Sequence, residues 1–112
     1  MEFDFSKQVG IKISIKTKSR TFYVNIEDIL YIRCDGYLST IFPVEDKSIC
    51  VAKSLREHEE ELSEYGFLRV NYNTLVNPKH IHDIEIIKGR KHIKVGKQEI
   101  NVSKRRAFLF NK

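Results

Sequence analysis

Short runs of alternating apolar and polar residues, each ended by a turn signal, constrain this chain more than any other feature. The clearest run is residues 11–16, where Ile11, Ile13 and Ile15 alternate with polar residues. This alternation has the period of a β-strand with one buried face. Similar β-type runs occupy residues 22–25, 29–33, 37–42, 48–51, 81–86, 92–95 and 100–102. The pattern predicts a mostly-β protein made of many short strands.

One segment has the period of a helix instead. Ser54 and Glu57 form the S-x-x-E capping box that begins many helices. Leu55, His58 and Leu62 then fall on one face. We expect one short helix near residues 54–65, with His58 partly buried and its polar tip near water. The remaining surface of this helix is rich in glutamate, so it should face away from any polyanion.

The length and the cysteine content limit the class of protein. A chain of 112 residues suits one domain with a modest core, here expected to span 11–112. Residues 1–10 are expected to be a tail or a linker remnant, with 1–8 frayed. Two cysteines are too few for a disulfide scaffold, and neither a signal peptide nor an apolar membrane span is evident. These features indicate a cytoplasmic protein that does not enter a membrane.

The charges are distributed unevenly along the chain. Residues 1–66 carry 9 Lys and Arg against 12 Asp and Glu, a net charge of −3. Residues 67–112 carry 11 Lys and Arg against 3 Asp and Glu, a net charge of +8. Such an asymmetry favours a polyanion-binding surface built mainly by the second half, although a solvated basic face without a partner would look the same.

Residues 66–77 combine an anchoring pattern with polar side chains. If the segment begins as a strand, Leu68, Val70 and Tyr72 share the face that packs on the core. The opposite face then carries the polar residues Arg69, Asn71 and Asn73. An asparagine amide donates and accepts hydrogen bonds at once, as adenine recognition in a major groove requires. The two asparagines can equally well serve only to make the turn.

Other chemistry is weakly supported. His80 and His82 could present two imidazoles on one face, joined by His58 or His92, but zinc needs about four convergent ligands and no cysteine lies near this pair. Cys34 beside Asp35 could act as a nucleophile, but the pattern favours a small apolar residue within a strand. No phosphate-binding glycine loop or nucleophile elbow occurs. We therefore expect no metal, no cofactor and no catalytic activity.

Four motifs in order resemble those of the LytTR DNA-binding domain. Residues 67–77 match the F-x-R-x-H-R-S-x-x-V-N signature at Phe67, Arg69, Val76 and Asn77. Residues 28–37 resemble the opening DI-x-YI…DGY, and residues 54–62 resemble the SL-x-E…L helix. The run Val102-Ser103-Lys104-Arg105-Arg106 resembles the closing VSRRR. The resemblance extends over roughly residues 11–110.

The resemblance implies both a fold and a partner. The fold would be an elongated stack of small antiparallel sheets, about ten short strands in all, with the one helix and a C-terminal helical turn. The partner would be double-stranded DNA, read in its major grooves by loops rather than by a recognition helix, typically by a homodimer on paired half-sites. Domains of this kind often belong to response regulators of two-component systems, fused to a receiver domain that these residues do not contain.

Three clusters are the expected DNA contacts. They are Arg69, Asn71, Tyr72 and Asn73; the hairpin tip Lys88, Arg90 and Lys91; and Ser103, Lys104, Arg105 and Arg106. By similarity, Asn71, a residue of the second cluster and Arg105 would read bases. Ser103 would cap the last turn and could offer a backbone N–H to a phosphate.

The sequence departs from the family signature at its centre, where His-Arg-Ser is replaced by Asn71-Tyr72-Asn73. Tyr72 loses a guanidinium that would suit a phosphate. Two other functions therefore stay open. One is a protein-interaction module that has lost DNA binding and uses the acidic helix. The other is a single-stranded nucleic-acid binder with Tyr23, Tyr37 and Tyr72 as stacking platforms.

Overall fold

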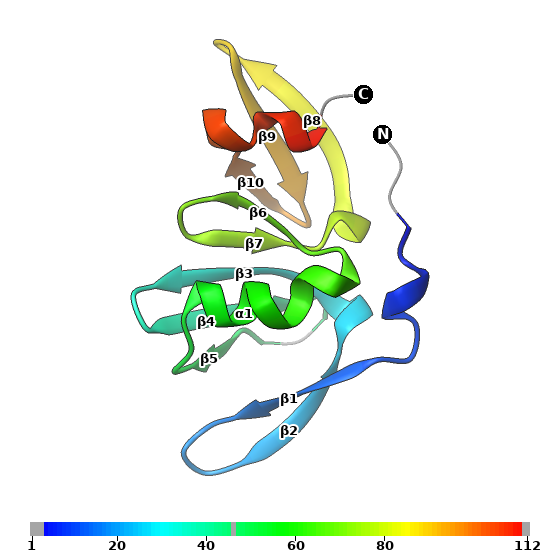
Figure 1. Cartoon of the computed structure of the whole chain (residues 1–112), viewed down its shortest axis with the longest axis vertical. Helices are drawn as coiled ribbons and strands as arrows, with labels where there is room; N and C mark the ends of the chain where they lie inside the picture. The colour runs from blue at the N-terminus through cyan, green and yellow to red at the C-terminus, as the bar shows by residue number, and fades with distance from the viewer. Residues whose placement is uncertain (1–3, 46, 111–112) are drawn as a thin grey trace.

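The computed structural model describes residues 4–45 and 47–110 and shows three antiparallel sheets (Figure 1). The expected mostly-β fold with about ten strands is confirmed. Its strands are β1 (Lys12–Lys16), β2 (Thr21–Asn25), β3 (Ile29–Asp35), β4 (Leu38–Pro43), β5 (Ile49–Val51), β6 (Leu68–Asn71), β7 (Thr74–Val76), β8 (Ile81–Ile87), β9 (Arg90–Val95) and β10 (Gln98–Asn101). The body measures 45 × 30 × 24 Å, so it is elongated as expected.

A five-stranded sheet in the order β5-β4-β3-β7-β6 forms the centre of the molecule. Neighbouring residues of β3 and β7 point to opposite faces, and both faces are covered. Ile32 and Leu75, which are paired across the strands, enter one core, whereas Tyr31 and Val76, also paired, enter another. Strands buried on both sides explain why residues 29–33 read as a nearly continuous apolar run.

The first core lies between the central sheet, the β1–β2 hairpin and the helix α1 (Leu55–Leu62). In the hairpin, Ile13 and Ile15 are buried and their strand neighbours are exposed, as the alternation predicted. Figure 1 shows α1 lying across the central sheet. Burying each such aliphatic side chain stabilises the fold by about 1.5–3 kcal/mol.

The helix forms where its capping box predicted. The Ser54 hydroxyl accepts from the backbone N–H of Glu57 at 3.2 Å, and the Glu57 carboxylate accepts in return from the backbone N–H of Ser54. A 3-10 turn, η3 (Ser63–Tyr65), continues the helix. Gly66 then adopts a left-handed conformation with φ 91° and directs the chain into β6.

The second core joins the central sheet to the sheet β10-β9-β8. Ile93, Val95, Ile100 and Val102 pack there against residues of β3, β6 and β7. The C-terminal helical turn is the 3-10 helix η5 (Lys104–Phe110), which contributes the buried Phe110. Because η5 and β6 share this core, the two segments that carry predicted DNA contacts are held together.

The N-terminal segment is more ordered than the sequence suggested. Ser6–Gln8 form the 3-10 turn η1, and Gln8 is fully buried. Its amide donates to the side chain of Asn77 and to the carbonyl of Tyr65, both at 2.9 Å, and accepts from Asn77 at 3.1 Å. The expectation that residues 1–8 fray is therefore wrong for η1, because a buried amide pair holds it. Residues 1–3 lie outside the described part.

Candidate nucleic-acid interface

The turn between β6 and β7 is built by its own asparagines. The Asn71 carbonyl oxygen Oδ1 accepts from the backbone N–H of Asn73 at 3.0 Å, and its Nδ2 donates to the carbonyl of Asn101 at 2.7 Å. Both ends of the Asn71 amide are therefore engaged within the chain, which fits the turn interpretation of this residue. These bonds leave one N–H and one lone pair of the amide for a further partner.

Tyr72 does not join the core. The register of β6 against β7 shifts between Arg69 and Asn71, so Tyr72 falls in the turn, and it is 82% exposed. The expectation that it shares the buried face of Leu68 and Val70 is wrong, because the irregularity ends the alternation one residue earlier. Its ring is presented to solvent at the tip of the turn.

The guanidinium of Arg69 stabilises the same turn by hydrogen bonds to its carbonyls. Its Nε donates to the carbonyl of Asn71 at 3.2 Å and its Nη2 donates to the carbonyl of Tyr72 at 2.9 Å. Its Nη1 lies 3.6 Å from a carboxylate oxygen of Glu59 on α1. The guanidinium thus fixes the loop and ties it to the helix, a structural role that sequence reasoning missed. The sequence signal for this role was that Arg69 occupies a position of the family signature.

Hydrogen bonds bring the three predicted clusters together. The backbone N–H of Ser103 donates to the carbonyl of Val70 at 2.9 Å, and Nη1 of Arg106 donates to the carbonyl of Arg69 at 3.3 Å. On the other side, Nζ of Lys91 donates to the carbonyl of Ala107 at 3.1 Å. β6, β9 and η5 therefore form one continuous surface. The backbone N–H of Ser103 itself is already used within the chain, so it is not available to a phosphate.

Four cations of the predicted set point outward. They are Lys88, Arg90, Lys104 and Arg105, all of them exposed. Among residues 4–45 and 47–110, no hydrogen bond or ion pair of the chain involves these four side chains. Lys88 has φ 52°, so the β8–β9 tip it shares with Gly89 is a tight left-handed turn. These side chains can bind an anion without breaking an existing contact.

The turns that carry these residues lie along one edge of the molecule. In Figure 1, the β3–β4 turn, the β6–β7 turn and the start of η5 all lie at the left, and the β8–β9 tip lies at the upper left. The view is down the shortest axis, and the body is only 24 Å deep along it. The edge is not uniformly basic, since Asp35 is exposed beside the β3–β4 turn.

The acidic face of α1 is partly neutralised within the chain. Glu59 faces Arg69, Glu60 pairs with Arg56 at 3.2 Å, and Glu61 pairs with Lys53 at 3.0 Å. The Arg56–Glu60 pair is mostly exposed, so it contributes little to stability. The helix thus offers a partner fewer uncompensated charges than its sequence suggested.

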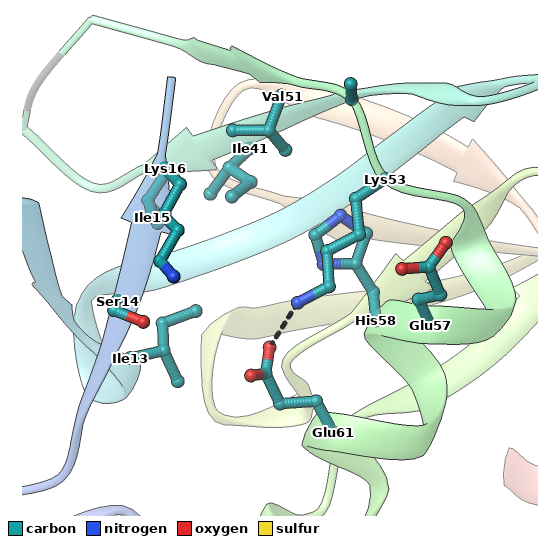
Figure 2. A pocket seen from close by; sticks show the side chains of 11 residues that line it. Ile13, Ser14, Ile15, Lys16, Ile41, Val51, Lys53, Glu57, His58 and Glu61 are labelled. Carbon is teal, nitrogen blue, oxygen red and sulfur yellow. Dashed lines mark hydrogen bonds and ion pairs between the residues drawn. The ribbon is translucent and has the colours of Figure 1, made fainter. Parts of the chain in front are cut away.

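A cavity of about 290 Å³ lies between α1 and β1 (Figure 2). His58, Lys53 and Glu61 line it together with isoleucines of β1 and β4. His58 is only 1% exposed, and its Nε2 lies 2.6 Å from the Ser39 hydroxyl. Its expected position with a tip near water is wrong, because the imidazole inserts fully beneath the Lys53–Glu61 pair. Burial lowers the pKa of His58 to about 4, so the ring is neutral near pH 7.

The arrangement of the side chains does not support a zinc site or a cysteine nucleophile. Nε2 of His80 bonds to the carbonyl of Glu27 and Nε2 of His82 to the carbonyl of Gly96, so the two imidazoles have different partners. Within the described ranges, no group of three His, Cys, Asp or Glu side chains is arranged to hold a metal ion. Burial raises the pKa of the Cys34 thiol, which disfavours the thiolate that nucleophilic attack requires. No helix of the described residues could span a membrane.

Comparison with known proteins agrees with this architecture. The family model of the LytTr DNA-binding domain matches residues 19–112. Among solved structures, the chain is similar to a LytTr DNA-binding domain from Bacillus cereus, whose parent protein is described as a methyl-accepting/DNA response regulator. The two share 21% identity with a TM-score of 0.73, and the alignment covers 88% of this chain and 92% of the other. No curated protein matches the sequence. From the match over residues 19–112, this chain belongs to the LytTR family of DNA-binding domains.

Proposed function

We propose that this domain binds double-stranded DNA in a sequence-specific manner and regulates transcription, using turns along one edge rather than a recognition helix. The observation that supports this most directly is the joining of β6, β9 and η5 by hydrogen bonds. It brings the exposed cations of the β8–β9 tip and of η5 onto one surface with the β6–β7 turn. An edge of this kind can follow the phosphates of a duplex while side chains enter the grooves.

The free cations divide into two roles. Arg105 is the candidate base reader, because a guanidinium can donate two parallel hydrogen bonds to O6 and N7 of guanine. Lys88 and Lys104 are point charges on flexible stems and suit phosphate neutralisation. Arg90, near the β8–β9 tip, could serve either purpose. Asn71 is the remaining amide candidate, through the N–H and the lone pair that its bonds to Asn101 and Asn73 do not use.

The wider assembly follows from the family. We propose that two copies bind paired half-sites as a homodimer, and that a receiver domain controls binding in the complete regulator. The Bacillus cereus relative is described as part of a response regulator, which supports the receiver domain of this proposal.

The salt dependence of the binding constant tests whether the domain binds DNA. If about six cations contact phosphates, log K should fall against log salt with a slope of about −5 on duplex DNA. The measurement is fluorescence anisotropy with a duplex selected from a random library, titrated from low to high salt. The same titration with a scrambled duplex should show weaker binding. A slope near zero on every duplex tested would contradict DNA binding.

Single-stranded nucleic acid is the second candidate. Tyr37 and Tyr72 are 83% and 82% exposed, and their turns are neighbours because the backbone N–H of Cys34 donates to the carbonyl of Asn73 at 2.9 Å. Exposed rings in adjacent turns can stack on unpaired bases. Competition decides between the two: excess single strand should leave the duplex complex intact if the main proposal is correct, and should displace the duplex if stacking dominates.

A further inference from the structure

We propose that the tip of the β1–β2 hairpin is an additional DNA contact, at which Lys18 and Arg20 bind phosphates of flanking DNA. The inference rests on the proposed function, since it extends the same edge. It assigns a role to two residues outside the three clusters predicted from the sequence. It also lengthens the DNA segment that one copy of the domain covers.

The hairpin is purely cationic. Residues 11–25 contain four cations, Lys12, Lys16, Lys18 and Arg20, and no acidic residue. All four are exposed. The ion pairs of the described residues involve none of them, although several other lysines of the chain are paired. A hairpin with this composition repels cations and attracts a polyanion.

The hairpin also holds one of these charges in place. The Arg20 guanidinium lies 4.6 Å from the centre of the Phe22 ring. Phe22 in turn packs against the first core. At the other side of the tip, the backbone N–H and the hydroxyl of Thr17 both donate to the carbonyl of Arg20, at 2.9 and 3.2 Å. The turn and the Arg20 side chain are therefore already held in place. Binding a phosphate then costs less conformational entropy than it would with a freely moving side chain.

The position of the tip points to DNA as the partner. In Figure 1, the β1–β2 tip lies at the lower left, on the same side as the β3–β4 and β6–β7 turns and the start of η5. The long axis of 45 Å runs vertically in this view. At 3.4 Å per base pair, that length corresponds to about 13 base pairs of B-DNA. A duplex laid along the edge thus passes both the η5 surface and the hairpin tip.

The contact is expected to position the domain rather than to read sequence. A lysine and a ring-stacked arginine on a strand tip suit the phosphate backbone, which carries no sequence information directly. The family match begins at residue 19, so Lys18 lies outside it. Lys16 lines the cavity beside α1, so Lys18 and Arg20 are the cleaner residues to test.

The experiment compares both ends of one hairpin. The tip variant is Lys18→Gln with Arg20→Gln, and the matched control is Lys12→Gln, an exposed lysine at the opposite end of β1. Binding is measured by anisotropy across a salt series, on a selected duplex with long flanks and on duplexes trimmed at either end. Thermal unfolding of each variant confirms that the fold is retained.

The expected result is a smaller salt slope for the tip variant, by about 1.8, with binding at 0.1 M salt weakened by about tenfold or more. The loss of affinity in the tip variant should be equal on preferred and random sequences. Trimming one flank of the duplex should abolish this difference between the tip variant and wild type. Lys12→Gln should bind like wild type. An unchanged slope for the tip variant on the long duplex, or an equal loss for Lys12→Gln, overturns this inference and leaves the proposed function standing. Failure of wild type to bind any duplex overturns both.

Discussion

The buried imidazole of His58 has an incomplete set of hydrogen bonds. Its Nε2 is bonded to Ser39, whereas its Nδ1 is buried without a partner in the structure. An unsatisfied buried polar atom costs about 1–3 kcal/mol. Burial, and after it the nearby charge of Lys53, disfavours the protonated ring, so the pKa of His58 is lowered from 6.5 to about 4. A residue that the sequence placed near water is thus a neutral part of the core.

The His58 pKa predicts a pH dependence of stability. A folded-state pKa below the unfolded value means that the stabilisation is complete above pH 6.5 and is lost as the pH falls toward 4. The loss should reach about 3 kcal/mol. Urea unfolding of wild type and His58→Leu at pH 7, 5.5 and 4.5 measures it. The variant should lose less over this range than wild type, and His82→Gln, an exposed control, should behave like wild type. Parallel pH profiles for wild type and His58→Leu would contradict the assignment.

Two adjacent arginines should separate binding from stability. Arg105 is exposed, whereas Nη1 of Arg106 donates to the carbonyl of Arg69. We expect Arg105→Ala to weaken binding to the preferred duplex by about 1–3 kcal/mol and to random duplex by less, without changing stability. Arg106→Ala should instead lower the free energy of unfolding by about 1 kcal/mol. Anisotropy and urea unfolding of both variants provide the test. Equal losses of Arg105→Ala on both duplexes would make Arg105 a phosphate contact.

At the scale of elements, Asn77 holds the N-terminal segment to the sheets. Its Nδ2 donates to Gln8 at 3.1 Å and to the carbonyl of Ile29 at 3.0 Å, and its Oδ1 accepts from the Gln8 amide at 2.9 Å. Both side chains are fully buried. The asparagine that closes the family signature therefore has a structural role here. It connects η1, the start of β3 and the end of β7.

A double-mutant cycle on Gln8 and Asn77 tests this link. Each single change to Ala leaves a buried amide without its partner, so Asn77→Ala should cost about 3 kcal/mol and Gln8→Ala about 2 kcal/mol. The double variant should cost less than the sum by at least about 1 kcal/mol, because no orphaned amide remains. The measurement is the free energy of unfolding in urea. Strict additivity would show that the two amides act independently.

The strands and the helix were largely predictable from the sequence. The alternation of apolar and polar residues in β1 and the capping box of α1 are both local patterns. The partners of polar side chains were not. Gln8 and Asn77 are 69 residues apart, and no periodicity indicates that two amides will meet. Arg69 looked like a ligand contact, yet its guanidinium binds carbonyls of the following turn. Local patterns determine which face is buried, whereas the pairing of polar groups depends on the assembled fold.

At the scale of the whole molecule, its length limits how two copies can share one duplex. If the 45 Å axis lies along the DNA, each copy occupies about 13 base pairs, which exceeds one helical turn of about 10.5 base pairs. Two copies on the same face therefore cannot be centred one turn apart. The nearest spacing that keeps them on the same face is two turns, about 21 base pairs.

Binding to duplexes with two half-sites should consequently depend on their spacing. We expect the strongest cooperativity at about 21 base pairs between centres, and a marked loss at about 16, where the second copy would face the opposite side of the duplex. A spacing of about 10 should allow only one copy to bind, because the two bodies would overlap. Anisotropy and analytical ultracentrifugation over a series of spacings, with a single half-site as control, measure both affinity and stoichiometry. Two copies bound at 10 base pairs would show that the long axis crosses the duplex instead of following it.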